Sequence, residues 1–133
     1  ALALVVVLDQ FTRNVARGTP RAYAGDARAL ALALALVDGG HDRTLSPLRR
    51  WFAYMPFEHA EDLALQRRCV QLFEQLLADA GPHRDAIAGA LDYARRHRDV
   101  IERFGRFPHR NDIVARASTA EEVEFLRQLG SRF

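Results

Sequence analysis

The sequence predicts an all-α protein of about six helices, arranged as an antiparallel helix bundle or a short α-solenoid. Apolar residues recur at helical spacing over long stretches, as in Ile87, Leu91, Ala94 and Ile101. Glycine, proline and helix-capping residues separate these stretches by short connections. No segment alternates apolar and polar residues for long enough to form a strand.

Two helices are expected in the first third of the chain. The first covers about residues 1–17 and ends at Gly18. The second begins where Thr19 can cap it and where Pro20 occupies the first turn. It is expected to end at the Gly39-Gly40 pair.

A short helix and a long helix are expected next. The short helix takes Ser46 as its cap and Pro47 as its first residue, and we expect it to end at Met55-Pro56 because proline disrupts a helix interior. The long helix should run from about Phe57 to Ala80 and close at Gly81.

The last third of the chain holds two helices and an unusual loop. Pro82 opens a long helix that stops at the loop Arg103–Asn111. Ser118-Thr119 followed by Glu121-Glu122 forms a capping-box pattern, which predicts a final helix through Leu129.

Length and composition indicate one domain over residues 1–133. The chain is 49% hydrophobic and 27% charged, with a formal net charge of +2. Every cation except histidine is an arginine, which codon bias in a GC-rich genome could explain. Arginine can also bind carboxylate or phosphate with two hydrogen bonds. Acidic residues are interleaved with the arginines, so we expect no nucleic acid partner.

Cysteine content and the N-terminal segment bear on the compartment. A single cysteine, Cys69, excludes an internal disulfide and favours a cytoplasmic location. The apolar run Ala1–Leu8 is too short to span a membrane, so we expect no membrane association. It reads as a core helix cut at its N-terminal end, and an apolar face left uncovered there would favour a homo-oligomer.

Metal and cofactor signatures are missing from the sequence. No H-E-x-x-H or paired E-x-x-H motif occurs, and the histidines are dispersed. A phosphate-binding glycine loop and a serine nucleophile elbow are also absent. We therefore expect neither a metal site nor a cofactor.

Two polar clusters lie in the first half of the chain. Asp9, Gln10, Arg13 and Asn14 share one face of the first helix, and this face either reaches solvent or lines a site. Glu58 and His59 follow Pro56. Acidic residues there would suit the positive end of a helix dipole, which leaves His59 unexplained. If the protein is an enzyme, Glu58 and His59 are the best general acid and base.

Two further clusters lie in the second half. His97 falls on the apolar stripe of its helix, where it is either a core histidine with one hydrogen bond or part of a site. The loop after this helix concentrates cations and an amide, which either tie down the helix end or bind an anion. Its candidate ligand-binding residues are Arg103, Arg106, His109, Arg110 and Asn111.

These clusters carry a resemblance to a known family. The chain resembles the bacterial domain of unknown function nine-twenty-four at four places. In order along the sequence these are Leu8–Asn14, Tyr54–Glu61, Arg96–Asp99 with Phe104–Asn111, and Ser118–Glu122 with Phe125-Leu126. The FGRFPHRN run at Phe104–Asn111 is the most specific element. The departures from its pattern are Thr12 for proline, Phe57 for leucine, Ala60 for serine, and Ala115 for glycine before Arg116.

The resemblance implies a TPR-like helical fold and a shared polar site, without an activity. We therefore expect the four clusters to meet around one pocket that binds a small anionic ligand, a phosphate or carboxylate compound. The alternative is a TPR-like interaction module, in which grooves between helices bind a protein or peptide partner and the polar motifs are structural.

Overall fold

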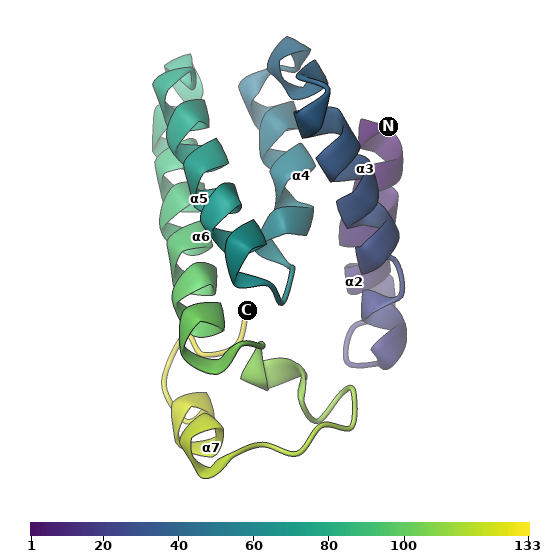
Figure 1. The fold of residues 1–133 in the computed structure, drawn as a ribbon, viewed down its shortest axis with the longest axis vertical. Coiled ribbons are helices and arrows are strands. Elements are labelled where there is room, and N and C mark those ends of the chain that lie inside the picture. The colour runs from purple at the N-terminus through teal and green to yellow at the C-terminus, as the bar shows by residue number, and fades with distance from the viewer.

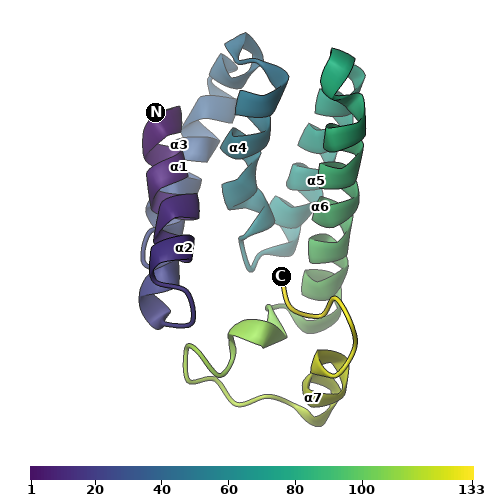
Figure 2. The ribbon, with the colours of Figure 1, turned by 180° about the vertical axis from the view of Figure 1, so that it is seen from behind.

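The computed structural model describes residues 1–133 and contains helices and turns but no strand, which confirms the all-α prediction. Figures 1 and 2 show the helices up to α6 standing side by side, with the segment after α6, which includes α7, lying at one end of them. None of the helices is both long and apolar enough to cross a membrane. The helices are α1 (Leu2–Val6), α2 (Thr12–Val15), α3 (Asp26–Asp38), α4 (Pro47–Glu58), α5 (Leu63–Ala78), α6 (Arg84–Phe104) and α7 (Ala120–Leu126).

The first predicted helix is continuous but irregular. Helices α1 and α2 are joined without a break by a π-helical segment, Val7–Phe11, so the chain has six helices as predicted. A π segment inside an α-helix is rare and is frequently found at functional sites. Asp9 lies in this segment and is almost fully buried.

The start of the second predicted helix was wrong. Thr19 makes no side-chain cap, and Pro20–Tyr23 form a short 3-10 turn, after which α3 begins at Asp26. Gly25 precedes α3 at a point where the backbone of the first helix comes close. A Cβ on Gly25 would lie 2.3 Å from the carbonyl oxygen of Leu8. The close approach of the two helices therefore requires glycine, and the chain turns before α3 can start.

The boundary predicted at Pro56 was also wrong. Helix α4 continues through Pro56 to Glu58, and its predicted cap residue Ser46 makes no side-chain hydrogen bond. Helix α5 begins only at Leu63, where the Asp62 side chain accepts a hydrogen bond from the backbone of Leu65 at 2.9 Å. Proline near the end of a helix removes one hydrogen bond, and burial of α4 against the core outweighs that loss. Glu58 consequently lies at the negative end of a helix dipole, where a carboxylate is not stabilised.

The main core lies between α3, α4, α5 and α6, each of which contacts the next along the chain. Its largest fully buried side chains include Tyr54, Phe57, Phe73, Leu76 and Ile87. The first helix packs on α3 and α4. These contacts place the end of the first helix beside the end of α4.

The C-terminal segment returns to the same end of the bundle. Helix α6 ends at Gly105, which has a φ of 71°, and Pro108–Arg110 form a 3-10 turn. The predicted capping box of α7 is present, with both hydrogen bonds between Thr119 and Glu122. Ala115, between the turn and α7, has a φ of 57°, which is unfavourable for a residue with a side chain.

Candidate functional site

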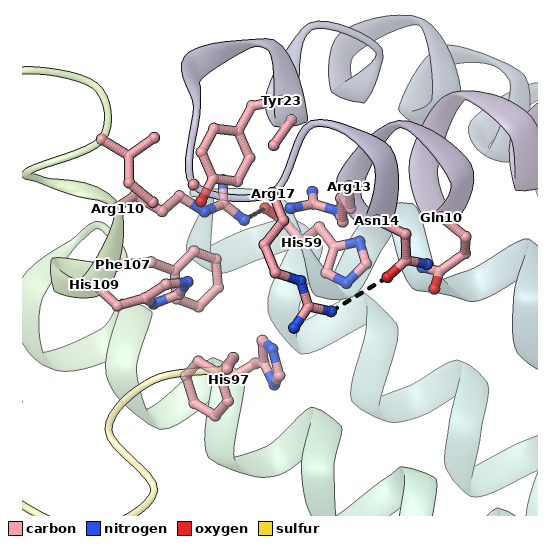
Figure 3. A pocket seen from close by; sticks show the side chains of 14 residues that line it. Gln10, Arg13, Asn14, Arg17, Tyr23, His59, His97, Phe107, His109 and Arg110 are labelled. Carbon is pink, nitrogen blue, oxygen red and sulfur yellow. Dashed lines mark hydrogen bonds between the residues drawn. The ribbon is translucent and has the colours of Figure 1, made fainter.

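A cavity of about 310 Å³ lies where the first helix, the end of α4, α6 and the C-terminal segment meet. Figure 3 shows arginine and histidine side chains from these separate elements lying around the same space. The cavity is lined by Gln10, Arg13, Asn14, Arg17, Gly18, Ala22, Tyr23, His59, His97, Phe107, His109, Arg110, Ile113 and Phe133.

Arg13 and Arg17 reach the cavity from the first helix. Arg13 donates a hydrogen bond to Oδ2 of Asp26 at 2.7 Å, and its Nε lies 3.5 Å from Oδ1 of Asp9. Arg17 is exposed and donates only to the side chain of Asn14, at 3.2 Å. Arg13 is therefore fixed by carboxylates, whereas most of the donors of Arg17 are free.

Arg110 is held rigidly on the opposite side. Its guanidinium lies between the rings of Tyr23 and Phe107, 4.6 Å from the centre of each. It donates to the backbone carbonyl of His59 at 2.9 Å and lies 3.8 Å from Asp26. Burial lowers the pKa of Arg110, although a guanidinium stays charged at neutral pH. The cavity thus contains a buried and oriented positive charge.

His59 forms a close pair with Asp9. Nδ1 of His59 lies 2.6 Å from Oδ1 of Asp9, across 50 positions of sequence. Burial alone would raise the pKa of Asp9, but the hydrogen bonds from His59 and Gln10 and the charge of Arg13 lower it overall. Asp9 is therefore ionised. Burial lowers the pKa of His59 despite its bond to Asp9, so its imidazole is neutral at pH 7.

His97 lies deeper, between Glu58 and the C-terminal residue. Its Nδ1 donates to the backbone carbonyl of Tyr93 at 2.8 Å, and its ring stacks on Phe133 at 3.8 Å between ring centres. Burial lowers the pKa of His97 to about 3. Burial and the negative charge of Asp9 raise the pKa of Glu58 to about 8. Both groups are thus neutral at pH 7, and their 3.6 Å approach is not an ion pair.

Several buried nitrogen atoms at this cavity have no hydrogen-bond partner. They are Nε of Arg13, Nδ1 of His109 and Nε of Arg110. Burial and the charges of Arg110 and Arg13 lower the pKa of His109 to about 4. Buried donors without a partner are uncommon because each loses its hydration. They come from the first helix and from the C-terminal turn, and Oδ1 of Asp26 behind them is also without a partner. The unfilled hydrogen-bonding capacity of the arginine nitrogens suits an anion.

The structure brings most of the expected site residues together. Those that line the cavity are Gln10, Arg13, Asn14, His59, His97, His109 and Arg110. Asp9 and Glu58 are buried behind the wall, where Asp9 contacts His59 and Glu58 approaches His97. The partner of His59 is therefore Asp9 and not Glu58, the residue we paired with it from the sequence.

Three expected residues lie elsewhere. Arg106 forms two hydrogen bonds to the carboxylate of Glu122, at 2.8 and 2.9 Å, and Asn111 donates to the same carboxylate at 3.1 Å. Arg103 pairs with Glu121 on the surface at 2.8 Å. All three connect the loop to α7 because carboxylates of that helix lie within reach. We therefore remove them from the candidate site.

Seven residues that line the cavity were not predicted as site residues: Arg17, Gly18, Ala22, Tyr23, Phe107, Ile113 and Phe133. Arg17 continues the face of Gln10, Arg13 and Asn14, so helical spacing alone could have identified it. Tyr23 and Phe133 carry no local signal, because their place in the wall depends on how distant segments pack.

Comparison with known proteins identifies similar chains without giving an activity. A family model described as "Bacterial protein of unknown function (DUF924)" matches residues 1–130. A solved structure of a protein of unknown function from Agrobacterium tumefaciens is 44% identical, with a TM-score of 0.80. The match covers 94% of this chain and 65% of that one, so the chain spans less than two thirds of that protein's length. No match is found among curated proteins.

Proposed function

This chain belongs to the DUF924 family of bacterial proteins of unknown function, and within that family we propose that it binds a small anionic ligand, a phosphate or carboxylate compound, in the cavity described above. The observation that carries the proposal is the set of buried nitrogens of Arg13, His109 and Arg110 that have no partner. An anion in the cavity would supply acceptors for the arginine nitrogens, and for Nδ1 of His109 in the tautomer that carries its proton there.

The charge balance around the cavity supports an anion over a cation. Arg13, Arg17 and Arg110 line it, whereas the two carboxylates in contact with these arginines, Asp9 and Asp26, lie in the wall behind. The histidines are neutral at pH 7, so the arginines outnumber the carboxylates by one positive charge. The amides of Gln10 and Asn14 can then orient the ligand.

Calorimetric titration with inorganic phosphate tests this function. Arg17→Ala should weaken phosphate binding about 10-fold or more, because a hydrogen bond to a charged group contributes roughly 1.5–3 kcal/mol. The fold should be unaffected, since the only side-chain partner of Arg17 is Asn14. Arg95→Ala is the matched control, because Arg95 bonds Glu74 on the surface and does not line the cavity. Equal affinities for the two variants, or no phosphate binding by the wild type, would refute the proposal.

One observation favours protein association as a second function. Leu4, Val7, Phe11 and Val15 are 38%, 51%, 62% and 70% exposed and are spaced three or four residues apart on the first helix. This spacing forms one apolar face. A second copy of the chain presents the same face, so the two can pack together. The face consists of four side chains, whereas a stable interface buries roughly 20–30 residues on each side, which is why the cavity remains our leading proposal.

Sedimentation across a range of protein concentrations tests the association. The wild type should dimerise as concentration rises, and Phe11→Glu should keep the chain monomeric because a buried charge opposes contact. A wild type that stays monomeric throughout would exclude this partner.

Three finer assignments are also proposals. Consecutive helices α3 to α6 each contact the next, which supports a TPR-like arrangement. Cys69 is free and buried, which suits a reducing cytoplasm. Interleaved acidic and basic residues argue against nucleic acid as the ligand.

A further inference from the structure

The Asp9–His59 pair gives the cavity a property that anion binding alone does not require. Because Asp9 is ionised and accepts, Nδ1 of His59 carries the proton of their 2.6 Å hydrogen bond. The lone pair of the neutral imidazole is then on Nε2. His59 lines the cavity, and Figure 3 shows its ring beside the space that Arg17 and Arg110 also border. A carboxylate-oriented imidazole beside an anion site has the geometry of a general base.

We propose that the protein hydrolyses a phosphomonoester, with Nε2 of His59 as the general base and Asp9 as the residue that positions it. The proposal rests on the anion site proposed above, because the arginines must hold the phosphoryl group next to His59. It goes further in assigning a reaction to that site.

The chemical step is a transfer of the phosphoryl group to water. Nε2 of His59 takes one proton from a water molecule while the water oxygen forms a bond to phosphorus. The bond from phosphorus to the ester oxygen breaks, and its electron pair leaves on that oxygen. The imidazolium then releases its proton to solvent, and the leaving oxygen takes one proton from solvent, so the products are an alcohol and inorganic phosphate. Arg17 and Arg110 stabilise the negative charge of the phosphoryl oxygens during transfer.

The number and direction of free donors favour a phosphoryl group over a carboxylate. Unpaired nitrogens come from the first helix at Arg13 and from the C-terminal turn at His109 and Arg110, and Arg17 adds exposed donors. A carboxylate presents its two oxygens in one plane, whereas a phosphoryl group presents three oxygens to donors on several sides. The apolar wall of the cavity, which includes Phe107 and Phe133, leaves room for an aromatic or apolar alcohol.

The surroundings of His59 determine the expected pH dependence. The charged and titratable groups that act on it are Asp9 and Arg13 from the first helix, Asp26 from α3, His97 from α6 and Arg110 from the C-terminal turn. Glu58 precedes it in the chain, and His109 lines the same cavity. Burial outweighs the attraction of Asp9 and lowers the pKa of His59 below its usual value. The rate should therefore fall on the acidic side, as the imidazole gains a proton, and reach a plateau near neutral pH.

Hydrolysis of p-nitrophenyl phosphate, followed by release of p-nitrophenolate, tests the proposal. His59→Gln should reduce kcat by about 100-fold or more, which is the usual contribution of a general base. Asp9→Asn should reduce kcat and shift the acidic limb of the pH profile, with little change in KM, because it acts through His59. His83→Gln is the control, since His83 lies in the turn before α6 and does not line the cavity. Far-UV circular dichroism establishes that each variant is folded.

A second measurement does not depend on the choice of ester. Diethyl pyrocarbonate acylates the unprotonated nitrogen of histidine, and mass spectrometry can follow each residue, with exposed His41 as an internal reference. Modification of His59 should be slowed by inorganic phosphate and by Asp9→Asn. If neither phosphate nor Asp9→Asn changes the modification rate of His59, the assignment of His59 as the general base is overturned. If the wild type binds phosphate in calorimetry but does not hydrolyse p-nitrophenyl phosphate, the proposed hydrolysis is overturned and the anion site stands. If the wild type does not bind phosphate, the anion site and the hydrolysis are both overturned.

Discussion

Replacing Ala115 with glycine should stabilise the protein. Ala115 has a φ of 57°, and its side chain is exposed, so the methyl group makes no buried contact that would be lost. A left-handed conformation costs a residue with a side chain about 1–2 kcal/mol. Glycine avoids this cost but adds roughly 0.4–1 kcal/mol of backbone entropy to the unfolded chain. The difference predicts a gain of about 0.5–1 kcal/mol in the free energy of unfolding.

Urea and thermal unfolding of Ala115→Gly measure this gain directly. The midpoint of thermal unfolding should rise by about 2–5 °C for a chain of this size. Ala117→Gly is the matched control, because Ala117 is exposed, lies in the same segment and does not have a positive φ. The control should lose roughly 0.4–1 kcal/mol. A loss of stability in Ala115→Gly comparable to the control would refute the assigned backbone strain, and with it the explanation of why the family resemblance expects glycine at this position.

Three further predictions concern proton and charge effects. Burial and Asp9 raise the pKa of Glu58 to about 8, so the folded protein keeps a proton that the unfolded chain releases. The free energy of unfolding should therefore fall by about 2 kcal/mol between about pH 6 and 8. Urea melts of Glu58→Gln should not show this pH dependence. Phosphate binding should raise the pKa of His109 from about 4, because an anion stabilises the protonated imidazole. Calorimetry near about pH 5.5 in buffers of different ionisation enthalpy should then detect proton uptake on binding. Identical heats of binding in these buffers would argue against an anion beside His109. Arg106→Ala should destabilise the fold, because the buried Glu122 loses two hydrogen bonds. In the same urea melts, Arg103→Ala should have little effect, because Arg103 pairs with Glu121 on the surface. Equal stabilities of the two variants would contradict the structural role of Arg106.

Some local signals in the sequence predicted local structure, although the caps expected at Thr19 and Ser46 make no side-chain hydrogen bond. The capping box at Thr119 and Glu122 and the glycine end of α6 at Gly105 depend on residues within one turn of each other, and both are present. The boundary at Pro56 was wrong because a local rule met a tertiary effect: the burial of Phe57 in the core holds α4 together past its proline. Sequence patterns alone do not contain that burial.

The candidate site was only partly predictable for the same reason. Polar residues on one helical face identified Gln10, Arg13 and Asn14, and they do line the cavity. The contact between Asp9 and His59 spans 50 positions, so no spacing rule could have paired them. The sequence grouped His59 with Glu58 because they are adjacent in the chain, yet the end of α4 directs the two side chains to different partners.

The π segment Val7–Phe11 sets the rotational phase of the first helix. In a regular α-helix each residue advances by about 100°, and a π turn contains roughly one additional residue. Buried Val5 before it packs on the bundle, while Arg13, Asn14 and Arg17 after it line the cavity. Deleting one residue from the segment would restore regular winding and rotate one half against the other by about 100°. The helix could then bury its apolar half or present Arg13 and Arg17 to the cavity, but not both.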